Sequence, residues 1–361
     1  MVRVKRRYSS VAIVLAAVVT AVVLGWLLYR PPALYRVTIL PSLGGNVAPF
    51  CSLNDSGQVA GVEYIGNNDQ HLFLWDREHG IRDLGAVWGS SAEINNAGQI
   101  CGTMAVEPNR HEGFLWEPGQ GRTMLGTLGG KWSAAYGINN RGQIIGLTHS
   151  ASPSHAFIWE KATGMRRLSG PDATPCIPVS INDAGQVLVT LVERPPSPMR
   201  YVLIDPNGPV FLDTGARNIQ LLSINNRSCM VGVEEPGGPR AHLVLRDERK
   251  TLRRLVPIST DWMTRVNDRN QIAYTNVRRK PLTALEDRYI RPRWPIDIEE
   301  RVSYLWDPIR GRVPLNRYVR GVKHLIVEDL NNNGCIVGTA DMKDGSTRLV
   351  LLEPIPERWG K

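Results

Sequence analysis

Short apolar runs separated by polar turns recur along almost the whole chain. In the clearest copy, residues 138–146, an apolar run ends at Ile138, the turn Asn139-Asn140-Arg141-Gly142 follows, and a second apolar run begins after it. This pattern predicts two strands joined by a tight turn. A type I turn followed by a residue in the left-handed region fits the spacing, and Gly is the favoured occupant of that last position. The Asn that opens the turn can hydrogen-bond the backbone two residues on.

The turn is present in seven copies. Their first asparagines are 41, 44, 43, 43, 42 and 64 residues apart, so only the last interval is irregular. Ser228 and Asn270 stand where glycine is missing, and asparagine tolerates a positive φ better than serine does. The turns lack the closely spaced carboxylates and terminal Glu of a calcium loop, which favours turn chemistry over metal binding. The predicted structural turn residues are Asn54, Gly57, Asn95, Gly98, Asn139, Gly142, Asn182, Gly185, Asn225, Asn267, Asn331 and Gly334.

Each repeat carries two further strand signals. An aromatic-aliphatic run, such as residues 72–75 or 157–159, is followed by a glycine-bearing turn and a fourth run, such as residues 164–168. Four short strands in about 42 residues are typical of a β-propeller blade. A β-solenoid, which uses shorter units, is the alternative.

The two ends of the repeat region complement each other. The last copy stops after its third strand, residues 348–352, and residues 35–40 form a strand-like run with no blade of their own. An N-terminal strand that completes the last blade closes the ring and removes two exposed edges. The sequence therefore predicts an all-β fold, a single seven-bladed β-propeller over residues 34–354 that is preceded by one N-terminal transmembrane helix, with a C-terminal tail at 355–361.

The N-terminal segment has the pattern of a membrane anchor. Residues 1–10 form a basic tail without an acidic residue, and residues 11–29 contain no charge, which is about the length that spans a hydrocarbon core. The basic flank predicts that the N-terminus stays in the cytoplasm. We expect a single-pass signal-anchor in the cytoplasmic membrane, a linker at 30–33 and a propeller in the periplasm or extracellular space. A cleaved signal peptide is the alternative, although no Ala-x-Ala site follows.

Three segments, residues 125–130, 135–146 and 155–159, carry a resemblance to a known group of proteins. Through them the chain resembles the HAF-type extracellular repeat proteins of bacteria over roughly residues 34–354. The match is strong in repeats 1 to 3 and weaker in repeats 4 to 6. The resemblance implies an exported repeat domain, and no activity or catalytic residue comes with it.

The irregular interval adds about 22 residues to the sixth repeat, close to 277–301, between its second and third strands. Loops at this position share a face with the links between blades, opposite the Asn turns. The loops at 63–70, 104–110, 148–154 and 193–198 belong to the same predicted loop-rich face. Arginine with Trp and Tyr is enriched at interface hot spots. The predicted partner-binding residues are Arg288, Tyr289, Arg291, Arg293 and Trp294. A solvated insertion without function is the competing interpretation.

Charge and reactive residues narrow the function further. The net charge of +9 falls to +5 without the four basic residues of the tail, and no recognition motif accompanies it, so we expect no nucleic-acid partner. The five cysteines form no Cys-x-x-Cys pair and are expected as small buried side chains, with a disulfide as the lesser alternative. His71, His155 and His242 occupy equivalent positions in separate repeats, which favours strand capping over a metal site. No catalytic, cofactor or metal residue is predicted.

The leading functional hypothesis is a membrane-anchored propeller that binds or scaffolds without catalysis. The membrane is its partner through residues 11–29, and a protein or an acidic cell-envelope polymer is the expected ligand on the loop-rich face. One alternative is an enzyme that acts on envelope glycans at the central channel, where Glu93 and Glu328-Asp329 are the few candidate acids. The other is a structural envelope protein that associates with itself.

Overall fold

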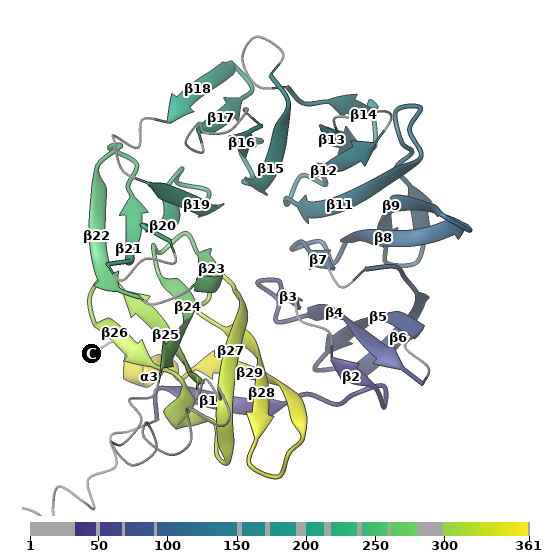
Figure 1. The fold of residues 1–361 in the computed structure, drawn as a ribbon. Coiled ribbons are helices and arrows are strands. Elements are labelled where there is room, and N and C mark those ends of the chain that lie inside the picture. The colour runs from purple at the N-terminus through teal and green to yellow at the C-terminus, as the bar shows by residue number, and fades with distance from the viewer. Residues whose placement is uncertain are drawn as a thin grey trace, which may run out of the picture.

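Seven antiparallel sheets are arranged as a ring in the computed structural model (Figure 1). The structure describes residues 33–47, 51–66, 69–89, 92–149, 154–169, 174–192, 200–212, 218–236, 240–258, 261–279 and 299–359. Each sheet is one blade. In blades 2 to 6 the strands pair in sequence order from the centre of the ring outward, whereas in blade 1 two short strands pair with the same neighbour and in blade 7 the outermost strand is the first strand of the described chain. The predicted seven-bladed β-propeller is confirmed.

Blades 1 to 4 follow the chain from its N-terminal half. Blade 1 contains β2 (Asn46–Val47), β3 (Ser52–Leu53), β4 (Val59–Ile65), β5 (Asp69–Asp76) and β6 (Gly80–Ala86). Blade 2 contains β7 (Glu93–Ile94), β8 (Ile100–Glu107), β9 (Arg110–Glu117) and β10 (Gly121–Met124). Blade 3 contains β11 (Trp132–Ile138), β12 (Ile144–His149), β13 (His155–Glu160) and β14 (Gly164–Arg167). Blade 4 contains β15 (Cys176–Ile181), β16 (Val187–Leu191), β17 (Tyr201–Asp205) and β18 (Gly208–Leu212).

Blades 5 to 7 complete the ring. Blade 5 contains β19 (Ile219–Ile224), β20 (Met230–Glu234), β21 (His242–Arg246) and β22 (Leu252–Pro257). Blade 6 contains β23 (Asp261–Val266), β24 (Ile272–Arg279), β25 (Glu299–Asp307) and β26 (Gly311–Pro314), followed by the short helix η2 (Asn316–Tyr318). Blade 7 contains β27 (Val322–Leu330), β28 (Ile336–Met342), β29 (Thr347–Pro354) and β1 (Tyr35–Ile39), and helix α3 (Pro356–Trp359) follows it.

The N-terminal strand closes the ring as predicted. Strand β1 pairs antiparallel with β29, from Tyr35 opposite Pro354 to Ile39 opposite Val350. The observed strand ends one residue before the predicted limit at Leu40. Because the first described strand completes the last blade, neither end of the ring leaves an unpaired edge.

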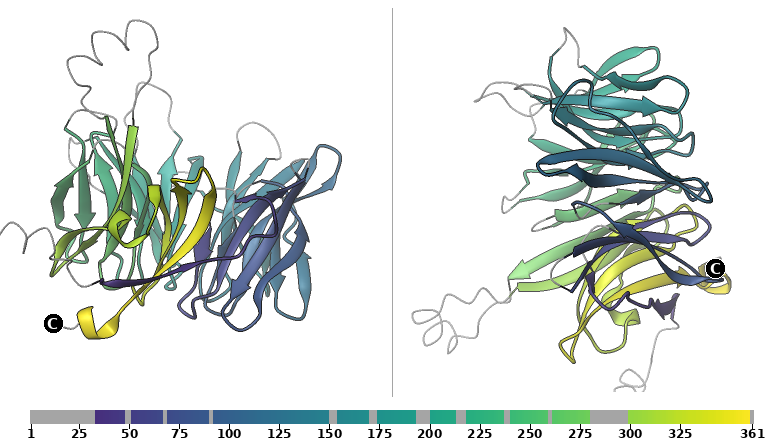
Figure 2. Two further views of the ribbon diagram at one scale, coloured as in Figure 1. Left: turned by 90° about the horizontal axis from the view of Figure 1, so that it is seen from below. Right: turned by 90° about the vertical axis from the view of Figure 1, so that its right-hand side faces the viewer.

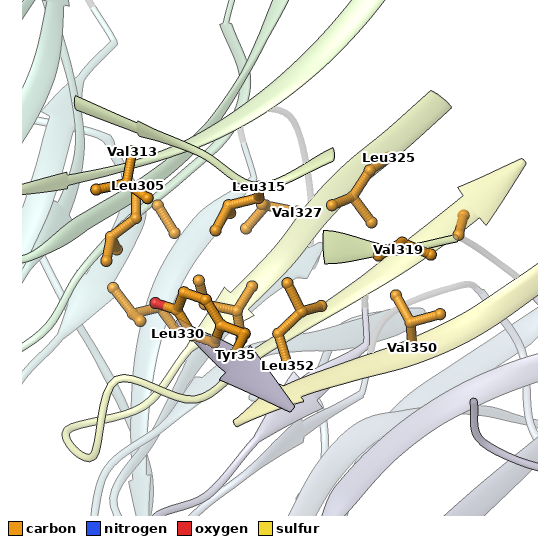
Figure 3. Packing of buried hydrophobic residues seen from close by; sticks show 13 residues of the cluster. Tyr35, Leu305, Val313, Leu315, Val319, Leu325, Val327, Leu330, Val350 and Leu352 are labelled. Carbon is orange, nitrogen blue, oxygen red and sulfur yellow. The ribbon is translucent and has the colours of Figure 1, made fainter. Parts of the chain in front are cut away.

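The hydrophobic core lies between blades. Each interface between neighbouring blades holds one cluster of buried apolar side chains among the described residues. Successive residues of a strand point to opposite faces of its sheet, so Ile144 packs toward blade 2 and Ile145 toward blade 4. This explains why the middle strands are continuous apolar runs, and Figure 3 shows the cluster between blades 6 and 7 around Leu305 and Leu325. Trp75 and Trp159 pack in such clusters, as expected.

The two faces of the ring differ in which connections they carry. The turn face carries the Asn turns between first and second strands and the turns between third and fourth strands. The loop-rich face carries the loops between second and third strands and the links between blades. Because β29 runs toward the turn face, the start of β1 and helix α3 lie there (Figure 2).

Strand pairing extends into three of the segments that the sequence predicts as loops on the loop-rich face. The insertion is narrower than 277–301, because β24 and β25 extend into it until Arg279 pairs with Glu299. Residues 63–70 and 104–110 are mostly strand, since the hairpins of blades 1 and 2 continue almost to their tips. The β-pairing of a long hairpin therefore reaches into segments whose polar composition predicts loops.

The remaining predictions about the ends and the cysteines have different outcomes. The predicted tail and anchor at 1–29 lie outside the described residues, and among those described there is no helix that is both long and apolar enough to span a membrane. All five cysteines are free. Cys51, Cys101, Cys176 and Cys229 are buried as expected, whereas Cys335 is partly exposed.

Candidate functional site

The first asparagine of each turn joins its blade to the next one. Every one of the seven is buried, and its Nδ2 donates to the backbone carbonyl of the corresponding asparagine in the following blade at 2.8–3.1 Å. The last bond, from Asn331 to Asn54, closes the ring of seven. The Oδ1 atom of the same asparagine accepts from the backbone of its own turn. In blade 3, for example, the backbone N of Gln143 donates to Oδ1 of Asn139. The seven asparagines lie in the turns between first and second strands, and the link between blades is an additional role that local turn chemistry does not predict.

The second turn position forms a parallel ring. Its members are Asp55, Asn96, Asn140, Asp183, Asn226, Asp268 and Asn332, and each accepts through Oδ1 from the backbone N of its counterpart one blade earlier, at 2.7–2.9 Å. The second oxygen of each carboxylate accepts from neighbouring asparagine Nδ2 groups, as Asp183 does from Asn140 and Asn226. The three carboxylates at this mouth of the channel are thus engaged by amide donors of the ring.

The sequence contains a signal for these two rings. The first position is asparagine in all seven copies, whereas the second is asparagine or aspartate. Both residues can accept a hydrogen bond, but only the amide of asparagine can also donate one. A position that must donate across an interface therefore excludes aspartate, and a position that only accepts does not.

Departures from the turn consensus are compensated by neighbouring side chains. Ser228 and Asn270 occupy the glycine position with φ of 59° and 58°. Ser228 donates through Oγ to Gln186, and Asn270 accepts from Nδ2 of Asn225. In blades 1 to 4 and 6, the first asparagine donates instead to a glutamine four residues later, a place that Cys229 takes in blade 5.

Three charged side chains meet in the central channel. Each belongs to the residue two positions before the first asparagine of its turn. Arg265 of β23 lies with Nη2 3.4 Å from Oε1 of Glu93 and with Nε 3.7 Å from Oδ1 of Asp329. The other oxygen of Asp329 accepts from the backbone N of Leu53 at 2.8 Å and from Ser52 Oγ at 3.3 Å. Blades 6, 7, 1 and 2 are joined by these contacts, whereas blades 3 to 5 have Gly137, Ser180 and Ser223 at the equivalent position.

The surroundings of Glu93 in this cluster raise the pKa of its carboxyl. Burial against the channel wall raises the pKa of the Glu93 carboxyl to about 7, although the guanidinium of Arg265 opposes the shift and Asp329 adds to it. Of the candidate acids named from the sequence, Glu93 and Asp329 both contact Arg265. Glu328 does not join them, since it is buried and accepts from Thr339 Oγ1 at 3.0 Å.

The loop-rich face exposes apolar side chains from several blades. Trp88, Leu128, Ile177 and Val192 are 48%, 43%, 43% and 46% exposed, and they belong to links, to a first strand and to a second-to-third-strand loop. Trp88 stacks on His111 with ring centroids 3.9 Å apart. Leu128 has a φ of 51°, a strained conformation for a branched side chain. Sequence reasoning missed these residues, because Ile177 and Val192 belong to apolar strand runs that predict burial, and Trp88 and Leu128 lie in links whose exposure the pattern does not predict.

The predicted partner-binding residues Arg288, Tyr289, Arg291, Arg293 and Trp294 lie outside the described residues. The structure does describe the strand ends Arg279 and Glu299 between which they are inserted, and these ends lie on the loop-rich face. The three repeated histidines sit in β5, β13 and β21 of separate blades. Within the described ranges, no three His, Cys, Asp or Glu side chains gather as a metal-binding group.

Comparisons with known proteins reveal the fold alone. No protein-family model matches the chain, and no curated protein matches it. Among solved structures, a prolyl endopeptidase is similar with a TM-score of 0.57 at 10% identity, covering 86% of this chain and 50% of that one. A puromycin-hydrolyzing peptidase from Mycobacterium tuberculosis gives 0.56 at 11%, covering 90% and 55%. The BP39L lectin from Burkholderia pseudomallei gives 0.51 at 9%, covering 85% and 96%. The chain spans about half the length of the peptidases it matches.

Proposed function

We infer that this protein is a membrane-anchored binding or scaffold module that presents the loop-rich face of its propeller to a ligand outside the cytoplasm. The observation that supports this proposal is that the chain enters the propeller on one face and the insertion begins and ends on the other. The first described residues leave the propeller at the turn face, and the ends of the insertion lie on the opposite face. An anchor at residues 11–29 then directs the loop-rich face away from the membrane.

The composition of the loop-rich face favours a protein ligand. Half-exposed apolar side chains such as Trp88 and Val192 are contributed by different blades, and interface anchors are enriched in aromatic residues and arginine. The insertion begins and ends on the same face, at Arg279 and Glu299, and its sequence contains Arg288, Arg291, Arg293 and Trp294. An acidic envelope polymer is the second ligand class that these arginines suit.

In-cell crosslinking followed by affinity capture tests the proposal. We compare the intact chain with a triple variant, Arg288→Glu, Arg291→Glu and Arg293→Glu, and with a chain in which residues 280–298 are replaced by a short Gly-Ser link. A partner captured by the intact chain is expected to be at least tenfold depleted in both variants. Equal recovery from all three chains would contradict a ligand site at the insertion.

A matched triple variant controls for charge. Arg36, Arg166 and Arg253 lie on the outer strands of blades 7, 3 and 5, whereas the insertion begins and ends in blade 6. Reversing these three charges changes the net charge by the same amount, so capture should stay at the intact level. Resistance of the intact chain to alkaline extraction from membranes tests the anchor separately.

One observation favours the enzyme alternative. Glu93 and Asp329 converge in the channel, and a carboxyl with a raised pKa suits a general acid. Their shared contact with Arg265 gives the same residues a structural role, which ties together blades at the closure of the ring. Turnover of an envelope glycan that is lost in Glu93→Gln and Asp329→Asn, with folding intact, would favour the enzyme.

A further inference from the structure

An exposed apolar ridge marks the turn face between blades 5 and 7. Ile309, at the turn between β25 and β26, is 94% exposed, against 51% for Phe211, the next most exposed large hydrophobic side chain among those described. Pro308 beside it lines two clefts. One cleft, of 830 Å³, lies between blades 6 and 7, and the other, of 470 Å³, lies between blades 5 and 6. Ile309 therefore stands at the top of a ridge with a cleft on each side.

Cations flank the ridge on both sides. Arg269 and Arg310 line the larger cleft, and Arg249 lines the smaller one. The acids of the clefts are engaged: Glu353 accepts from Arg77 at 2.7 Å, and Glu248 accepts from Arg227 at 2.8 Å.

Arg249, Lys250 and Arg269 are exposed. Of the other two acids, Asp307 is buried and accepts from Nε2 of Gln271, and Asp247 pairs with Arg253 at 3.0 Å. The ridge thus combines an exposed aliphatic tip with solvent-facing positive charge.

The chain enters the propeller beside this ridge. Arg310 donates through Nη2 to the carbonyl of Arg358 at 2.8 Å, and Arg358 donates through Nη1 to the carbonyl of Ala33 at 2.8 Å. Only three residues separate Ala33 from Tyr29, the last residue of the predicted anchor. At 3.8 Å per residue, four steps span at most about 15 Å. A bilayer that holds residues 11–29 is therefore close to Arg310 and the ridge.

We propose that this ridge is a membrane-contact surface, in which Ile309 inserts at the bilayer interface and Arg249, Arg269 and Arg310 face the phosphates of anionic lipids. Aliphatic insertion combined with basic residues is how peripheral surfaces bind such membranes. The centre of the turn face carries Asp55, Asp183 and Asp268, which anionic lipids repel. The propeller therefore contacts the membrane through blades 5–7 and not through the centre of its turn face. This inference rests on the proposed anchor.

Quenching of tryptophan by brominated lipid tests the surface. The full chain is reconstituted in nanodiscs of phosphatidylcholine with phosphatidylglycerol, and the emission added by Ile309→Trp is measured above the wild-type background. The matched variant is Phe211→Trp, which places the same side chain at another exposed apolar position on blade 4. We expect brominated acyl chains to quench the added emission of Ile309→Trp at least twofold more than that of Phe211→Trp.

Lipid charge and the arginines provide the second comparison. Arg249→Glu with Arg269→Glu should reduce the excess quenching of Ile309→Trp in discs that contain phosphatidylglycerol. Unchanged quenching would overturn the role of the arginines. Equal quenching of the two tryptophan variants in discs that retain the chain would overturn the ridge and leave the anchor standing. Failure of the intact chain to enter the discs would contradict both the proposed anchor and the membrane-contact surface.

Discussion

The two faces of the propeller are built on opposite principles. On the turn face, the same two positions of every repeat form two closed rings of hydrogen bonds between neighbouring blades. On the loop-rich face, each blade contributes a different link or loop, and no ring of equivalent side chains connects them among the described residues. The repeat is therefore conserved within the chain where blades must fit together and varies where they need not.

This difference indicates where the molecule can acquire function. A substitution in a ring position affects two blades at once, because its donor and acceptor belong to different blades. A substitution in a loop affects only its own surroundings, and loops on rigid scaffolds are where binding residues concentrate. The contrast can be tested by removing one side chain from each region.

The largest effect is expected in the first ring. Asn139 is buried and makes bonds to Arg141 N, Gln143 and the carbonyl of Asn182. Asn139→Ala should lower the free energy of unfolding by about 2–4 kcal/mol, because a buried network loses both donor and acceptor groups. Chemical denaturation measures this change.

Two companion variants identify which bond matters. Asn140→Ala removes the exposed neighbour in the second ring, and we expect a loss of about 1 kcal/mol or less. Asn139→Asp keeps the acceptor of the turn but not the donor to blade 4. Wild-type stability of Asn139→Asp would contradict the inter-blade bond as the reason for asparagine.

An intermediate effect is expected from Glu93, through pH. The pKa of this carboxyl is about 7 in the folded protein and about 4.3 when unfolded, so between these values only the folded state keeps the proton. The contribution of Glu93 to stability therefore falls as pH rises through this window. Thermal unfolding from pH 4 to pH 8 should show the wild type losing stability relative to Glu93→Gln, and parallel curves for the two proteins would contradict the raised pKa.

The smallest effect on stability is expected on the loop-rich face. Trp88 is half exposed and stacks on His111, so Trp88→Ala should cost about 1 kcal/mol or less. Binding should respond in the opposite order: if Trp88 belongs to the ligand surface, partner capture falls in Trp88→Ala and persists in Asn140→Ala. A large loss of stability on removing Trp88 would instead assign it to the core.

Much of the fold was predictable because it is repeated. The period of about 42 residues, the four strand signals and the spare N-terminal strand together predict seven closed blades, since no single blade can bury both of its faces. The turn chemistry was readable locally too, and Gly142 has a φ of 75° in the structure. The limits of β24 and β25 were not, because strand pairing overrides the local preference of polar residues.

Sequence alone determined the number of blades, the way the ring closes and which residues form the tight turns, because these follow from local chemistry repeated at a fixed period. Only the tertiary structure decided which groups meet across the ring. Arg265 and Glu93 are 172 residues apart in the chain, and their contact depends on the geometry of closure. The ridge at Ile309 likewise comes close to the entry of the chain at Ala33 only because the first strand completes the last blade. Local periodicity carries no information about such pairs, and the closed ring creates them.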